Sequence, residues 1–84
     1  MSPDSTTAPY TPRLGQVLAF IYYYTRIHRQ PPAEADIARY FGISPPSAHQ
    51  MVVMLEGRGL IERTPGRARS IRLLLARDEI PDLE

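Results

Sequence analysis

The stretch SPPSAHQMVVML, residues 44–55, followed by EGRGLI, residues 56–61, decides the fold of this chain. It predicts one helix that begins at Ser44 or Pro45, because a serine hydroxyl caps a free N–H and proline needs no donor at the first helical position. The stripe expected to be buried follows i, i+4, i+7 spacing and consists of Ala48, Val52 and Leu55. The opposite arc carries Pro46, Gln50 and Val53, flanked by Ser47 and His49. Such a helix packs on a core and leaves its first two turns free for a partner.

Length and composition limit the class of protein. The chain has 84 residues, enough for one domain with a small core. It has no apolar run long enough to span a membrane and no signal peptide at its start. The absence of cysteine removes disulfides, thiolate metal sites and redox catalysis, and fits a cytoplasmic protein. His28 and His49 have no carboxylate cluster beside them in the sequence, so we expect surface side chains and no metal site.

The net charge of +1 conceals an uneven distribution. All ten basic residues are arginines within residues 10–77, which hold only four acids, so this body carries +6. The last seven residues hold four acids, and Asp4 precedes the body. A cationic body with acidic ends suits a polyanionic partner. The alternative is an arginine-rich surface that only reflects a compositionally biased genome.

A long helical segment precedes the opening stretch. Thr11 before Pro12 gives a cap-and-proline start, and apolar residues at helical spacing predict a helix over residues 12–29. The pair Pro31-Pro32 ends it, because proline lacks an N–H and restricts the residue before it. The expected inward positions are Leu14, Val17, Leu18, Ile21 and Tyr24.

A second, short helix is predicted over residues 33–40. Ala33 is a poor cap, so the start of this helix should fray. Gly42 can adopt the left-handed conformation that ends a helix, and only a tight turn separates it from Ser44. Two helices joined by such a turn are typical of a helix-turn-helix. The positions expected to face inward are Ala35, Ile37, Ala38 and Phe41.

Two short strands follow the opening stretch. They are predicted at residues 60–63 and 70–75, joined by a turn at residues 64–69 that contains a Pro-Gly pair. We expect Arg63 and Arg72 to face each other, where like charges repel and a phosphate between them would relieve the repulsion. The side chains expected to point inward are Ile61, Ile71 and Leu73. The arginines of this hairpin are Arg63, Arg67, Arg69 and Arg72, against the single acid Glu62.

The predicted elements define a mainly α fold with a small β-hairpin. Three helices plus a two-stranded antiparallel wing make a winged helix-turn-helix, which we assign to residues 11–76. Residues 1–10 are rich in Ser, Thr and Pro without periodicity, which predicts a disordered leader. Residues 77–84 are expected to form a solvated acidic tail.

Several short motifs occur along the chain in an order that is typical of one family. They are Thr11-Pro12-Arg13, Val17-Leu18, Phe20-Ile21, Pro31-Pro32, Asp36-Ile37-Ala38, Gly42, Ser44-Pro45, Ala48, Leu55, Gly59-Leu60-Ile61-Glu62, Pro65-Gly66 and Arg69-Ser70-Ile71. Together they resemble the N-terminal DNA-binding domain of LexA repressors over about residues 11–75. The resemblance implies a DNA-binding winged helix that regulates transcription as a repressor. The serine-proline start also looks like recognition-helix starts in the iron-dependent repressor and MarR groups.

Three departures from the LexA pattern limit what the resemblance implies. The LexA peptidase uses a Ser–Lys dyad, and this chain has no lysine, so self-cleavage is excluded and we expect no enzyme. The turn after Gly42 is one residue shorter. The positions that read bases in the family are occupied here by Pro46, Ser47, His49 and Gln50. A DNA-binding winged helix with its own operator is therefore implied.

The predicted third helix supplies the candidate base contacts in the major groove of duplex DNA. Gln50 is the best base reader, because its amide donates and accepts together at an adenine edge. We expect Ser47 and His49 to contact either bases or phosphates. Ser44 is placed to bind a phosphate together with the N–H groups of the helix start. The alternative for each is a solvated helix surface.

Arginines supply the candidate backbone contacts. Arg67 and Arg69 at the wing tip would lie along phosphates or enter the minor groove. Arg13, near the start of the first helix, is a weaker phosphate candidate. Their alternative role is solubility, and a winged helix that binds an acidic protein partner is the alternative function. We expect no catalytic residue, cofactor or membrane contact.

Surplus apolar side chains raise the question of self-association. The run Tyr22-Tyr23-Tyr24 cannot face inward as a whole, so at least one ring should be exposed. Val53 and Met54 also exceed what a small core holds. Either these are single exposed apolar residues, which are normal, or they form the contact of a homodimer.

Overall fold

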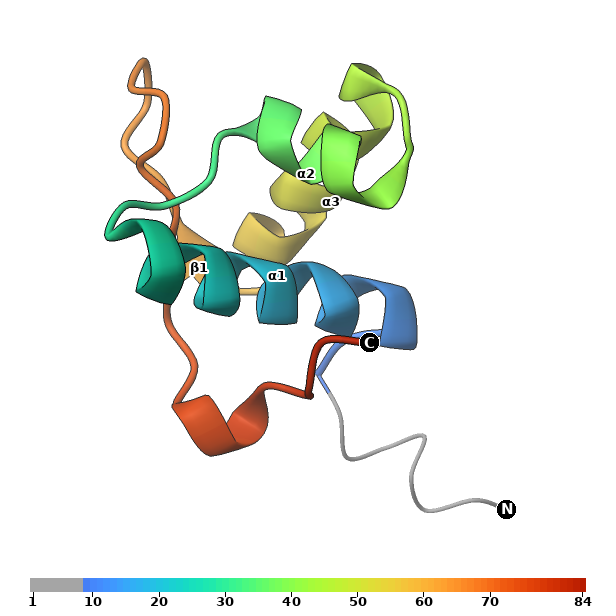
Figure 1. Ribbon diagram of the computed structural model, residues 1–84, viewed down its shortest axis with the longest axis vertical. Helices are drawn as coiled ribbons and strands as arrows, with labels where there is room; N and C mark the ends of the chain where they lie inside the picture. The colour runs from blue at the N-terminus through green and yellow to red at the C-terminus, as the bar shows by residue number, and fades with distance from the viewer. Residues whose placement is uncertain (1–8) are drawn as a thin grey trace.

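Three helices and a small hairpin make up the computed structural model, which describes residues 9–84 (Figure 1). In chain order the elements are α1 (Pro12–His28), α2 (Glu34–Phe41), α3 (Pro45–Gly57), β1 (Ile61–Glu62), β2 (Arg72–Leu73) and the 3-10 turn η2 (Arg77–Glu79). α1 crosses the molecule in front of α3, and the hairpin loop rises beside α2. The two strands pair antiparallel. This arrangement confirms the predicted winged helix-turn-helix.

The helices α1 and α3 begin as the sequence predicts. The hydroxyl of Thr11 accepts a hydrogen bond from the Leu14 N–H, and that of Ser44 accepts one from the Ser47 N–H, both at 3.2 Å. Each cap is followed by proline at the first helical position. Gly42 ends α2 in the left-handed conformation, at a φ of 66°. The turn between α2 and α3 and the starts of α1 and α3 are therefore encoded locally.

The start of α2 has a partner that replaces the missing cap. Ala33 offers no side-chain oxygen, but the Asp36 carboxylate accepts a hydrogen bond from the Ala33 N–H at 2.8 Å. Burial alone would raise the pKa of Asp36, but this hydrogen bond and the charges of Arg69 and Arg39 outweigh it and hold the pKa below its usual value. The prediction that the helix frays at Ala33 therefore overlooked the carboxylate at the third helical position.

The core lies between α1 and α3 and is closed by α2 and the hairpin. The predicted stripe of α3 is fully buried, and so are Leu18 and Ile21 of α1. Ile37 and Ala38 are the buried residues of α2, whereas Ala35 is exposed, so its predicted inward position was wrong. An eight-residue helix against two neighbours buries only a narrow arc.

The hairpin is shorter than predicted and has a different register. Ile61 lies opposite Leu73, and Glu62 lies opposite Arg72, with which it forms an ion pair. The prediction that Arg63 faces Arg72 was therefore wrong, and with it the phosphate between them. Ile61 and Ile71 are buried and Leu73 is half-buried, as expected.

The C-terminal segment, residues 76–84, folds back along α1, and we call it the strap (Figure 1). Ile80 is buried, so the prediction of a solvated tail was wrong there. The Gln16 side chain donates to the Asp82 carbonyl at 3.0 Å and accepts from the Glu84 N–H at 2.9 Å. Gly15 permits the close approach, because a Cβ there would stand 3.2 Å from Pro81.

The N-terminal end of the described chain joins the same contact. The Tyr10 hydroxyl donates to the Glu79 carbonyl at 2.6 Å, and a Cβ on Gly15 would stand 2.8 Å from the Tyr10 ring. Tyr10 therefore does not behave as part of a disordered leader. Positions 1–8 of that predicted leader lie outside the described residues.

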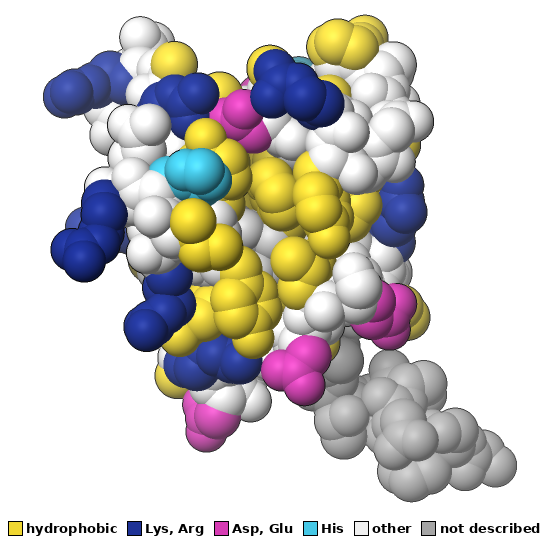
Figure 2. All heavy atoms as spheres, viewed as in Figure 1, with side chains coloured by type: hydrophobic (Ala, Val, Ile, Leu, Met, Phe, Trp, Pro, Cys, Tyr) yellow, Lys and Arg dark blue, Asp and Glu magenta, His cyan; other side chains and the backbone are white. Residues whose placement is uncertain are grey.

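The tyrosine run of α1 is covered rather than exposed. Tyr22, Tyr23 and Tyr24 are all half-buried, so the expectation of at least one exposed ring was wrong. Arg77 lies over the Tyr22 ring at 4.8 Å and donates to the Tyr23 hydroxyl at 2.9 Å. Figure 2 shows hydrophobic side chains gathered over the middle of this face, with arginines along its edge.

Candidate nucleic-acid interface

The outer arc of α3 is free, as its sequence predicts. Val52 is fully buried against the core. The side chains on the other side of the helix are all exposed: Pro46, Ser47, His49, Gln50 and Val53. Because the stripe fixes the rotation of the helix about its axis, the polar side chains point away from α1. The helix can therefore enter a groove without disturbing the core.

The first turn of α3 has no free N–H to offer a phosphate. Pro45 and Pro46 carry none, and the N–H of Ser47 is held by the Ser44 hydroxyl. The Ala48 N–H donates to the Ser44 carbonyl at 3.0 Å. The N–H groups of Ser47 and Ala48 are therefore already occupied where the sequence predicts a phosphate beside Ser44. The Ser44 hydroxyl also donates to the Ser47 oxygen at 2.9 Å, which leaves the Ser47 proton free for a partner.

His49 is not isolated, although nothing near it in the sequence predicts a partner. Its Nδ1 lies 3.0 Å from both carboxylate oxygens of Glu34, at the start of α2. Glu34 also accepts from Arg63 at 2.9 Å, and Arg63 donates in turn to Glu56 of α3. This ion network ties together α2, α3 and the base of the wing. Its members are 15 to 29 residues from Glu34 in the chain, so only the fold brings them together.

Arg67 is exposed on the wing, whereas the Arg69 side chain lies against the body of the domain. The Ser70 hydroxyl holds the loop, donating to the Arg67 carbonyl at 2.9 Å and accepting from the Thr64 N–H at 3.0 Å. Arg69, at a φ of 55°, turns back to the body and pairs with Asp36 at 2.9 Å. The Arg69 guanidinium also donates to the Tyr24 hydroxyl at 3.0 Å; that bond and the Asp36 charge raise the pKa of Arg69.

Ion pairing determines which arginines of the domain body remain without a carboxylate partner among residues 9–84. Within residues 9–84, each acid of the domain body is paired with arginine: Glu34 and Glu56 with Arg63, Asp36 with Arg39 and Arg69, and Glu62 with Arg72. Of the predicted backbone contacts, only Arg67 and Arg13 have no carboxylate partner among these residues. Arg13 is exposed and lies over the Phe41 ring at 5.3 Å.

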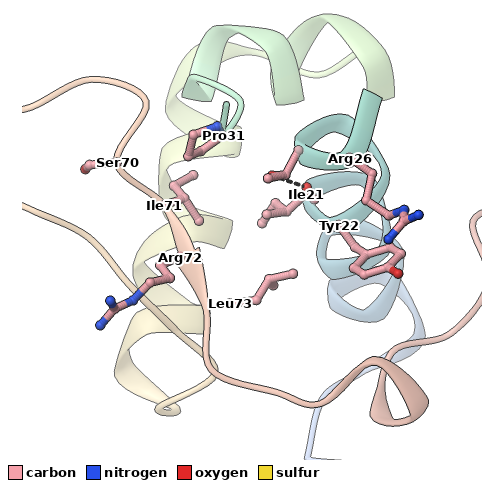
Figure 3. A pocket seen from close by; sticks show the side chains of 9 residues that line it. Ile21, Tyr22, Arg26, Pro31, Ser70, Ile71, Arg72 and Leu73 are labelled. Carbon is pink, nitrogen blue, oxygen red and sulfur yellow. Dashed lines mark hydrogen bonds between the residues drawn. The ribbon is translucent and has the colours of Figure 1, made fainter. Parts of the chain in front are cut away.

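An apolar groove of about 400 Å³ opens between α1 and β2 (Figure 3). Ile21, Ile71 and Leu73 point into it, and Arg26 and Arg72 stand at its rim. The groove shares the core residues Ile21 and Ile71 as part of its walls. Residues 9–84 contain no group of three or more His, Asp or Glu side chains that could hold a metal ion.

In this chain the short helix α2, a glycine turn and the amphipathic helix α3 are followed by an antiparallel hairpin. This order defines a winged helix-turn-helix domain. Residues 7–70 match the model of the LexA DNA binding domain. The chain belongs to that family.

The LexA repressor of Cupriavidus pinatubonensis is 42% identical over 78 residues, which cover 89% of this chain and 36% of the relative. The LexA repressor of Thermosipho melanesiensis is 37% identical over 70 residues, covering 83% of this chain and 35% of the relative. That of Pseudomonas aeruginosa is 41% identical over 64 residues, covering 75% and 31%. The chain thus spans about a third of the length of these relatives. No helix among residues 9–84 is long and apolar enough to cross a membrane.

Proposed function

We propose that this protein is a transcriptional repressor that binds a specific sequence in duplex DNA. The observation that carries the proposal is the outer arc of α3, polar and exposed on a helix whose other face is locked into the core of a LexA-type domain. In this proposal α3 lies in the major groove, and Gln50, His49 and Ser47 face the bases. A DNA-binding regulator acts where the chromosome is, so we place the protein in the cytoplasm.

The remaining predicted site residues have supporting roles. Arg67 contacts a phosphate or the minor groove, and Arg13 is the second backbone contact. Ser44 and Pro46 shape the entry of α3 rather than bind DNA directly, since the Ser44 hydroxyl is occupied and Pro46 has no polar group. Arg69 acts through Asp36 by holding the wing against α2. An acidic protein partner is less well supported, because Ser47, His49 and Gln50 on the exposed side of α3 offer hydrogen-bonding groups suited to base edges rather than a row of cations.

Selection of bound sites from a random duplex pool tests this function. We expect a defined sequence to be enriched and the affinity to fall steeply with salt. An inverted repeat among the selected sites would support a homodimer, whereas a single half-site would contradict it. Failure to enrich any sequence would overturn the proposed function.

Arg67→Ala should weaken binding to every duplex by a similar factor. One lost phosphate contact reduces the slope of log affinity against log salt by about 1. Arg26→Ala is the matched control, because Arg26 is an exposed arginine near the end of α1 and is not among the proposed DNA contacts. The measurement is fluorescence anisotropy over a range of salt concentrations. Equal slopes for wild type and Arg67→Ala would exclude the wing from the interface.

Gln50→Ala should weaken binding to the selected site much more than to random duplex. A bidentate amide–adenine pair contributes about 1–3 kcal/mol of discrimination, or roughly 5- to 150-fold. Gln30→Ala is the control, since Gln30 is an exposed glutamine in the segment between α1 and α2. An unchanged ratio of specific to random affinity in Gln50→Ala would remove this side chain from the base contacts.

A further inference from the structure

Glu34 contacts two parts of the candidate interface, α3 and the wing, that are far from it in the sequence. It stands at the first position of α2 and contacts His49 on the outer arc of α3 and Arg63 at the base of the wing. The His49 side chain remains 54% exposed, so one edge of the imidazole meets Glu34 while another faces solvent. The carboxylate therefore contacts one edge of the His49 ring and leaves the rest of the ring accessible to a partner.

The contact decides which ring nitrogen carries the proton. An ionised carboxylate can only accept hydrogen bonds, and both oxygens of Glu34 lie 3.0 Å from Nδ1 of His49. Nδ1 must then carry the hydrogen. A neutral imidazole has a single N–H, so Nε2 is left as a bare acceptor. Free imidazole side chains in water favour the opposite form, with the hydrogen on Nε2.

We propose that Glu34 is a specificity-determining residue that fixes His49 in its Nδ1–H form, so that Nε2 accepts a hydrogen bond from a base. In the major groove only adenine N6 and cytosine N4 donate, whereas guanine and thymine present acceptors at the corresponding edge. His49 thereby selects adenine or cytosine at one position of the bound sequence. This inference rests on the proposed function, because it requires α3 to lie in the major groove.

Protonation should reverse the preference. At low pH Nε2 also carries a hydrogen and becomes a donor, which suits guanine or a phosphate oxygen. The charged groups around His49 are Glu34 of α2, Arg63 beside the wing, and Glu56 of α3, which reaches the network through Arg63.

Nitrogen-15 spectra of labelled histidine test the tautomer without DNA. At a pH above 8 we expect His49 to carry its hydrogen on Nδ1 in wild type, and on Nε2 in Glu34→Ala. His28 is the internal reference, since its ring packs on Tyr24 and no carboxylate contacts it among residues 9–84. Glu62→Ala is the matched control, because Glu62 pairs with Arg72 in the wing. A wild-type His49 with its hydrogen on Nε2 would overturn the inference, whatever the protein binds.

Site selection tests the consequence for DNA. At high pH the wild type should prefer adenine or cytosine at one position by about 3- to 10-fold, less than a bidentate contact gives. Glu34→Ala and His49→Ala should both lose that preference, and the double variant should lose no more than either one. An unchanged preference in Glu34→Ala would overturn the inference. Failure of the wild type to bind duplex would instead overturn the proposed function, and the readout by His49 would fall with it.

Discussion

Leu55→Ala is expected to lower the free energy of unfolding by about 2–5 kcal/mol, because it leaves a cavity under α3 that the core cannot close. Leu55 is fully buried and is the last residue of the stripe that holds this helix. A domain of this size has a small margin of stability, so a substantial unfolded fraction should appear at room temperature. Urea denaturation followed by circular dichroism measures the change.

The neighbouring residue provides the control for this substitution. Met54 is 41% exposed on the same helix, one position away, and Met54→Ala should change stability by well under 1 kcal/mol. Comparison of Leu55→Ala with Met54→Ala therefore separates the effect of stripe packing on stability from the effect of helix propensity. Similar losses in the two variants would contradict the orientation of α3, and with it the assignment of the outer arc to DNA.

Ile80→Ala is expected to cost about 2–4 kcal/mol of folding free energy, although it lies in a segment whose composition predicts a solvated tail. Ile80 is only 5% exposed and anchors the strap beside the contacts of Gln16 and Tyr10. Because the strap packs on α1 and not on α3, the folded fraction should bind the selected DNA site with unchanged affinity. Thermal denaturation and anisotropy measure the two quantities.

Leu74→Ala serves as the control for the strap. Leu74 is 49% exposed and lies just before the strap, so its loss should have little effect on unfolding. An Ile80→Ala variant as stable as wild type would show that the strap is not part of the cooperative domain. A stable variant with weakened DNA binding would instead connect the strap to the interface.

Local chemistry explains which parts of the fold the sequence predicts correctly. The caps at Thr11 and Ser44 and the left-handed Gly42 each depend on residues within one helical turn. The Asp36 carboxylate that caps α2 was also visible in the sequence, three residues after Ala33, where a capping box places its acid.

The errors in the predicted contacts of the arginines involve partners on other elements. Arg63 and Arg72 form no facing pair, because the register of the hairpin places Glu62 opposite Arg72. Arg69 belongs to the wing in sequence, yet its guanidinium pairs with Asp36 of α2. Charge and polarity identify such residues as surface groups, but they do not specify which surface groups meet.

The sequence by itself determined the three helices, the rotation of α3 about its axis and the family, because periodicity and capping act over a few residues. Only the tertiary structure decided which arginines remain available for DNA, that the strap covers α1, and that Glu34 supports His49. Those features depend on contacts near 3 Å between side chains of different elements. Such contacts form only when the helices pack against one another, so the local sequence does not specify them.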